Sequence, residues 1–124
     1  MITENAALLG RRGEDVAAHF LCARGYQIRE RNFRIRGGEI DIIAEIDGAI
    51  IFAEVKTRCN KGFARAADAV DAAKQKRIIK TAMTYLAKNK LGECPCRFDV
   101  LEVYKKPNEL FEIEHIRGAF EIEG

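Results

Sequence analysis

No apolar stretch in this 124-residue sequence is long enough to span a bilayer, which argues against a protein anchored by membrane-crossing helices. The first residues also lack the basic segment followed by an apolar segment that marks a signal peptide. Both features favour a protein that stays inside the cell. We therefore expect a cytoplasmic protein with no membrane partner.

Cysteine occurs at only four positions, and its spacing does not fit a metal module. Cys94 and Cys96 form one Cys-x-Cys, whereas zinc modules use pairs of Cys-x2-Cys. No secretory context supports disulfide bonds for the four cysteines. We expect these thiols to be structural or incidental.

The rest of the composition is ordinary, with no internal repeat and no low-complexity segment. Hydrophobic residues make up 48% and charged residues 32% of the chain, which is typical of a globular protein and not of a disordered one. A chain of this length can bury one core without disulfides or structural metals. We expect a single domain over residues 1–124.

Basic residues exceed acidic ones only slightly, but they are concentrated in one part of the chain. The net charge is +2, yet residues 55–90 contain ten Lys and Arg residues and only two Asp. This bias is typical of a phosphate-binding surface, although a solvated, lysine-rich helix face would also produce it. The residues that we expect to contact nucleic acid are Arg34, Arg58, Lys61 and Arg65.

An Asp47-Gly48 pair between two apolar runs predicts a tight β-hairpin, because both residues tolerate the positive φ of a type I′ turn. With a two-residue loop, Ile46 faces Ala49 and every later pair follows from that register. One face of the hairpin is then apolar throughout, which pins the register firmly.

The same register brings acidic residues together at the far end of the hairpin. Asp41 is predicted directly opposite Glu54, and Glu39 opposite Lys56. Facing residues in an antiparallel pair point to the same side, and like charges so placed repel unless a cation lies between them. The hairpin therefore predicts a cation site, with Glu39 as a supporting partner of Lys56.

Periodicity and turn signals predict two helices and five strands. The second helix begins with Asp71 as its cap, and Gly25 ends the first. The order is α-β-β-β-α-β-β, and a helix that joins the third strand to the fourth predicts an α/β fold in which helices flank a mixed sheet of about five strands. The helices are expected at 10–24 and 71–88, and the strands outside the hairpin at 26–33, 97–104 and 110–116, the last at a sheet edge.

These residue types suit metal-assisted chemistry on phosphate. A few carboxylate oxygens, from Asp41 and Glu54, are the ligands that Mg²⁺ or Mn²⁺ takes while it keeps several waters. Lys56, on the same face of its strand, could position a water or neutralise developing charge. Glu14, near the start of the first helix, either orients a water or only favours the helix dipole.

Several short blocks, in this order along the chain, resemble the YraN family of small bacterial proteins. They are residues 10–14, 31–34, 38–41, 52–58 and 97–100, and they spread over nearly the whole chain. The acidic pair followed by a lysine also resembles the PD-(D/E)xK nuclease superfamily, whose restriction-endonuclease-like fold is shared with archaeal Holliday-junction resolvases. One departure is Ile40, which stands where the superfamily's name has proline.

That resemblance implies a restriction-endonuclease-like domain that hydrolyses DNA phosphodiesters with Mg²⁺ or Mn²⁺, acting on branched, nicked or single-stranded DNA in repair or recombination. It also implies a supporting polar residue from the helix after the third strand, and the candidates are Lys74 and Gln75. The implied metal ligands are Asp41 and Glu54, and the implied catalytic set is Glu14, Asp41, Glu54 and Lys56.

Two other functions are compatible with the same fold. One is a catalytically silent module that binds nucleic acid, and the other is a protein-interaction adaptor that uses the acidic C-terminal segment. A merely structural ion-pair cluster is less favoured, because burying charges costs about as much desolvation as their attraction recovers. By analogy with junction-cleaving proteins, we expect a homodimer.

Overall fold

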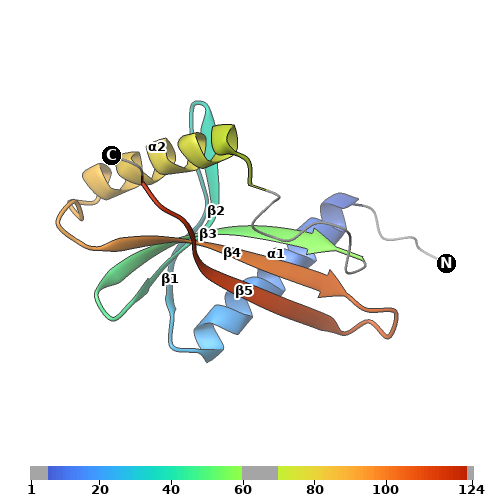
Figure 1. Cartoon of the computed structure of the whole chain (residues 1–124). Coiled ribbons are helices and arrows are strands. Elements are labelled where there is room, and N and C mark those ends of the chain that lie inside the picture. The colour runs from blue at the N-terminus through green and yellow to red at the C-terminus, as the bar shows by residue number, and fades with distance from the viewer. Residues whose placement is uncertain (1–5, 60–69, 123–124) are drawn as a thin grey trace.

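The helices and strands follow one another in the predicted order. The computed structural model describes residues 6–59 and 70–122. The five strands form one mixed sheet, and the two helices lie on opposite faces of it (Figure 1). The elements are α1 (Ala6–Ala23), β1 (Gln27–Ile35), β2 (Gly38–Ile46), β3 (Ala49–Arg58), α2 (Ala72–Lys88), β4 (Cys96–Lys105) and β5 (Phe111–Phe120).

The strand order across the sheet is β1-β2-β3-β4-β5, so β1 and β5 form its edges. All neighbours are antiparallel except β3 and β4, which are parallel. Parallel neighbours need a long crossover, and the segment containing α2 supplies it, as predicted. Within the ranges 6–59 and 70–122, no helix combines the length and the apolarity needed to cross a membrane.

The hairpin turn is confirmed. Asp47 and Gly48 have φ of 50° and 80°, the left-handed values that a type I′ turn requires. The pairing that follows is the predicted one from Ile46 and Ala49 as far as Ile42 and Ala53. A sequence signal of two residues therefore sets the register of the two central strands.

Beyond that point the predicted pairing is wrong. The ladder between β2 and β3 ends at Ile42 and Ala53, and the Asp41 carboxylate accepts a hydrogen bond from the backbone N–H of Val55 at 2.8 Å. Because a side chain takes the place of a backbone acceptor here, β2 turns away from β3. Ile40, which the alternation assigns to the apolar face of the hairpin, packs instead in the core on the α2 side.

Two hydrophobic cores share the sheet, one under each helix. The core on the α2 side contains Phe33, Ile43 and Phe52, and the core on the α1 side is closed by Ala17 and Leu21 from α1. Fully burying a large apolar side chain stabilises the fold by roughly 1.5–3 kcal/mol. The central strands are buried on both faces, which holds the residues at their ends in place.

α1 ends and α2 begins where the sequence predicts, but α1 begins at Ala6 and not at the predicted residue 10. Gly25, with φ of 89°, ends α1, and the N–H of Tyr26 bonds back to the Leu21 carbonyl at 3.0 Å. Asp71 caps α2 by accepting from the N–H of Lys74 at 2.8 Å. This cap fixes the first turn of α2, which carries Lys74 over the sheet.

Candidate active site

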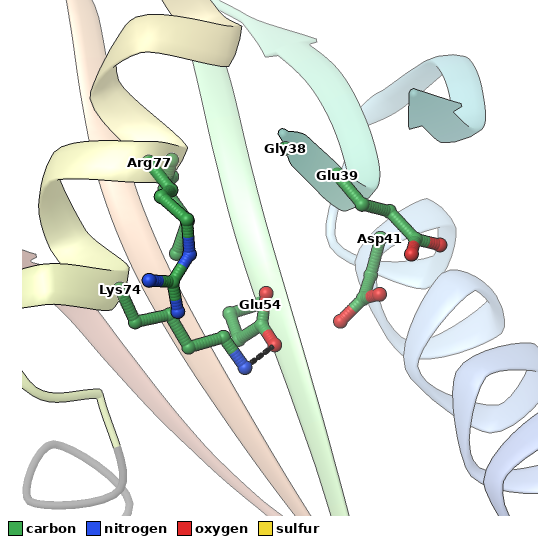
Figure 2. Close-up of a pocket in the computed structure, with 7 residues that line it drawn as sticks. Gly38, Glu39, Asp41, Glu54, Lys74 and Arg77 are labelled. Atoms are coloured by element: carbon green, nitrogen blue, oxygen red, sulfur yellow. Dashed lines mark ion pairs between the residues drawn. The ribbon is translucent and has the colours of Figure 1, made fainter. Parts of the chain in front are cut away.

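A small cavity lies where the start of α2 passes over the diverging ends of β2 and β3 (Figure 2). Its volume is about 190 Å³. Acidic side chains come from the strands and basic side chains from the helix, so the two walls carry opposite charges. The residues that line the cavity are Gly38, Glu39, Asp41, Glu54, Lys74, Arg77 and Ile78.

Asp41, the predicted metal ligand on β2, is held in an environment that disfavours its charge. Burial and the neighbouring charge of Glu54 raise the pKa of Asp41 to about 7, and the charges of Glu14 and Glu39 add to the effect. The hydrogen bond from Val55 offsets only part of this. A cation beside Asp41 would relieve the excess negative charge.

Glu54, the second predicted ligand, is almost fully buried, with 9% of its side chain exposed. Two ammonium groups contact the same carboxylate oxygen, Oε1: Lys74 Nζ lies at 2.7 Å and Lys56 Nζ at 3.6 Å. The structure thus brings the predicted Lys56 and one of the two helix candidates to Glu54.

The two lysines differ in how firmly they hold their protons. Burial, followed by the adjacent Lys74, lowers the pKa of Lys56. Burial alone would also lower the pKa of Lys74, but its contact with Glu54 raises it. Lys56 is therefore the better placed of the two to give up a proton.

Glu14 lies on the other side of Asp41, at the edge of a second hollow of about 360 Å³. Its Oε1 accepts hydrogen bonds from Asn32 Nδ2 at 2.9 Å and from Arg31 at 3.1 Å, which fixes the carboxylate. The hollow also contains Asp41 and Lys56, so Glu14 belongs to the same neighbourhood, as predicted. Its role there remains a prediction.

The predicted pairing of Glu39 with Lys56 is wrong. Glu39 faces Arg34 across β1 and β2, and Arg34 Nε lies 3.1 Å from Glu39 Oε1. The divergence of β2 from β3 explains the difference, since it removes Glu39 from the ladder that would place it beside Lys56. Glu39 lines the cavity with Asp41, and Arg34 stays largely exposed on the sheet edge.

Gln75, the other helix candidate, contacts the chain just before α2. Its Nε2 donates to the Val70 carbonyl at 2.9 Å, which fastens the start of the helix. Between the two candidates, Lys74 is the residue that the structure brings to Glu54.

The predicted nucleic-acid contacts meet different outcomes. The Arg58 guanidinium forms an ion pair with Glu102, whose side chain is fully buried, so much of its charge is already compensated. Lys61 and Arg65 lie outside the described residues.

Sequence reasoning missed Arg77, which lines the cavity, although its spacing of three from Lys74 places both on one face of a helix.

The donor set fits a hard divalent cation with few protein ligands. Over residues 6–59 and 70–122, no group of three or more His, Cys, Asp or Glu side chains is gathered as a metal cluster. Mg²⁺ commonly needs only one or two carboxylates and takes its other ligands from water and phosphate. Asp41 and Glu54 supply those two carboxylates, and a bound cation would offset the burial and the repulsion that raise the pKa of Asp41.

Comparison with known proteins gives consistent matches over most of the chain. The model of the uncharacterised protein family UPF0102 matches residues 13–103, from α1 into β4, which include every residue contributed to the cavity. A UPF0102 protein of Geotalea uraniireducens is 46% identical over 114 residues, which cover 92% of this chain and 90% of the relative.

Two further UPF0102 proteins show the same level of similarity. The protein of Symbiobacterium thermophilum is 46% identical over 112 residues, covering 90% of this chain and 95% of the relative. The protein of Clostridioides difficile is 45% identical over 108 residues, covering 87% and 92%. All three relatives are bacterial and match along nearly their full length.

Proposed function

This chain belongs to the UPF0102 family, for which YraN is another name, and we propose that it is a nuclease-like protein that hydrolyses DNA phosphodiesters with Mg²⁺ or Mn²⁺. We also propose that the domain belongs to the PD-(D/E)xK superfamily, because its acidic pair and the lysine two residues after the second acid resemble that superfamily's motif. The observation that carries the proposal is the pair of strand carboxylates, Asp41 and Glu54, that share a charged cavity with Lys56 beside them.

The proposed roles follow from the position of each side chain. Asp41 and Glu54 hold the cation, which supplies Lewis acidity towards a phosphoryl oxygen when bound. The Lys56 ammonium donates hydrogen bonds to an oxygen on which negative charge grows, or exchanges a proton with the attacking water. Glu14, fixed by Arg31 and Asn32, orients that water from the second hollow.

In the reaction, a water oxygen forms a bond to phosphorus while the bond from phosphorus to a sugar oxygen breaks. The water loses one proton and the leaving oxygen gains one, so no other reactant is needed. The cytoplasm, where bacterial DNA and Mg²⁺ are both present, is the proposed place of action. The expected substrates are branched, nicked or single-stranded DNA, and the expected assembly is a homodimer.

The direct test is cleavage of such DNAs by the purified protein with and without Mg²⁺ or Mn²⁺. Asp41→Asn is expected to lower the cleavage rate by at least about a hundredfold, since it removes charge that stabilises the bound cation and the transition state. Asp47→Asn is the matched control, because it makes the same chemical change in the exposed turn at the other end of β2 and should leave cleavage unchanged.

A second candidate is a silent module that binds nucleic acid and no longer cleaves it. It is favoured by the contact of two lysines with Glu54, which compensates that carboxylate without a metal. DNA binding without turnover in any divalent cation would support it. Absence of divalent-cation binding in calorimetry, with or without DNA, would rule out the nuclease.

A further inference from the structure

The Lys74 ammonium lies against one of the two carboxylate oxygens that Glu54 could offer to a cation shared with Asp41. It is 2.7 Å from Glu54 Oε1, whereas the Lys56 ammonium is 3.6 Å from the same oxygen. One buried carboxylate oxygen is therefore the meeting point of two positive charges. Such an arrangement compensates Glu54 more than fully and leaves Asp41 with no ion pair to a lysine or arginine among the described residues.

The two lysines are held differently. Lys56 lies on β3 two residues from Glu54, so the strand itself keeps both side chains on one face. Lys74 reaches the same oxygen from α2, across the cavity, with a flexible four-carbon stem and 29% of its side chain exposed. Because its backbone lies on α2 and not on the strand that carries Glu54, Lys74 can turn from Glu54 towards the helix side of the cavity by side-chain rotation alone.

The cavity offers a second place for that ammonium. Its acidic wall consists of Glu39, Asp41 and Glu54, and its basic wall consists of Lys74 and Arg77 (Figure 2). The part of the chain that the structure describes provides no ion pair for the Arg77 guanidinium. A volume of about 190 Å³ gives room for about six water-sized groups, enough for a phosphate group with a few waters.

We propose that Lys74 is a displaceable counter-ion: a divalent cation bound by Asp41 and Glu54 drives its ammonium off Glu54, and the released ammonium then joins Arg77 in a subsite for phosphate oxygens of DNA. The proposal rests on the function proposed above. A cation of charge +2 repels the adjacent ammonium and takes the oxygen that held it. Arg77 and the released Lys74 then face the cation across the cavity, where an anion bridges the two walls.

Metal binding and DNA binding are coupled by this exchange. Coupling between two ligands is reciprocal, so DNA that captures the Lys74 ammonium also strengthens metal binding. Without metal, Lys74 is held by Glu54 and contributes little to a phosphate. The exchange thus keeps the phosphate subsite incomplete until the metal is present.

The first experiment measures Mn²⁺ binding to the full chain by calorimetry in the absence of DNA. Lys74→Met keeps the length of the side chain but removes its charge, and it is expected to bind Mn²⁺ at least about fivefold more tightly than the original chain. Lys74→Arg keeps the charge and should bind as the original chain does. Lys76→Met, at an exposed position of the same helix, is the control and should change nothing.

The second experiment measures binding of a short single-stranded oligothymidylate by fluorescence anisotropy with and without Ca²⁺, which replaces Mn²⁺ to avoid cleavage. Ca²⁺ should strengthen binding to the original chain by at least about fivefold, and this gain should be smaller in both Lys74→Met and Arg77→Met. Thermal unfolding of each variant shows that it is folded.

The outcomes distinguish failure of the counter-ion proposal from failure of the proposed metal-dependent nuclease function. Equal Mn²⁺ affinities for the original chain and Lys74→Met would overturn the counter-ion role while leaving the metal site intact. Binding of Mn²⁺ by Lys74→Met but not by the original chain would show that Lys74 blocks the site without being displaced, which would overturn the exchange. If neither protein binds a divalent cation, both this proposal and the metal-dependent nuclease fall.

Discussion

At the scale of single residues, Asp41 is held in a state that costs stability. Its carboxylate replaces a backbone acceptor beside Val55, lies near Glu54, and has a pKa of about 7. A carboxyl whose pKa is higher in the folded protein than in the unfolded chain destabilises the fold once both states are ionised. Functional sites often keep such costs because the chemistry needs them.

Asp41→Asn should therefore stabilise the metal-free protein above neutral pH. The unfolded carboxyl ionises near pH 3.8 and the folded one near pH 7, so the original chain loses stability between these values as pH rises. The difference in free energy of unfolding between variant and original is expected to be near zero below pH 4 and on the order of 4 kcal/mol at pH 8. Urea unfolding at a series of pH values measures it.

Two controls sharpen that measurement. Asp47→Asn should show no gap that grows with pH, because Asp47 lies exposed in the turn. Adding Mn²⁺ at pH 8 should stabilise the original chain but not Asp41→Asn. The difference between their free energies of unfolding should therefore narrow or change sign. A difference in stability between Asp41→Asn and the original chain that stays constant across pH would contradict the raised pKa of Asp41.

At the scale of elements, the contact between α2 and β2 sets the geometry of the cavity. The space for a Cβ at Gly38 is already filled, since that atom would lie 1.9 Å from Thr81 Oγ1 and 3.2 Å from the Arg77 carbonyl. Thr81 is fully buried and donates to the same carbonyl at 2.7 Å. Glycine thus lets the helix approach the strand closely enough for Lys74 to reach Glu54.

Gly38→Ala should lower the free energy of unfolding by roughly 1–3 kcal/mol, because the added methyl overpacks this contact. In a Thr81→Ala background the hydroxyl is gone, so the same substitution should cost much less, and a double-mutant cycle in urea measures the coupling. Gly92→Ala is the control, since nothing lies within 4 Å of its added Cβ. Strictly additive losses would show that the contact is not the cause.

At the scale of the whole molecule, one buried charged network links segments that are far apart in sequence. Asp99 on β4 accepts two hydrogen bonds from Arg97 at 2.8 Å, lies 2.7 Å from His115 Nε2 on β5, and accepts from the N–H of Gly118. Arg97 also donates to the hydroxyl of Tyr26, just before β1. The network joins β4, β5 and the segment before β1 at the border of the α1-side core.

Acid should weaken the whole fold through this network. Burial alone would raise the pKa of Asp99, but the hydrogen bonds from His115 and Arg97 lower it to about 2, below the 3.8 of the unfolded chain. Its contribution, about 2 kcal/mol, is therefore present above pH 4 and is lost as pH falls towards 2.

Asp99→Asn tests this by urea unfolding between pH 2 and pH 7. The original chain should be the more stable protein near neutral pH, and the difference should shrink as pH falls from 4 to 2. Asp47→Asn again serves as the exposed control. A difference that does not depend on pH would assign the loss to packing and not to charge.

Much of the fold could be predicted because its signals are local. Asp47-Gly48 fixes a turn, Asp71 and Gly25 mark helix ends, and alternation places Glu54 and Lys56 on one face. These features depend on φ preferences, capping and the period of a strand, which a few neighbouring residues determine. The contact of Arg58 with Glu102 joins segments distant in sequence and was not predicted. The contact of Glu39 with Arg34 is close in sequence, but it depends on the register between β1 and β2, which no turn signal assigned.

The sequence by itself determined the order of elements, the register of the hairpin as far as Ile42 and Ala53, and the presence of two carboxylates and a lysine at its end. Only the tertiary structure decided that Asp41 ends that ladder and that Lys74, not Gln75, reaches Glu54. The reason is that local chain geometry fixes the first set, whereas the second depends on how β2 leaves β3 and on where α2 packs over the sheet.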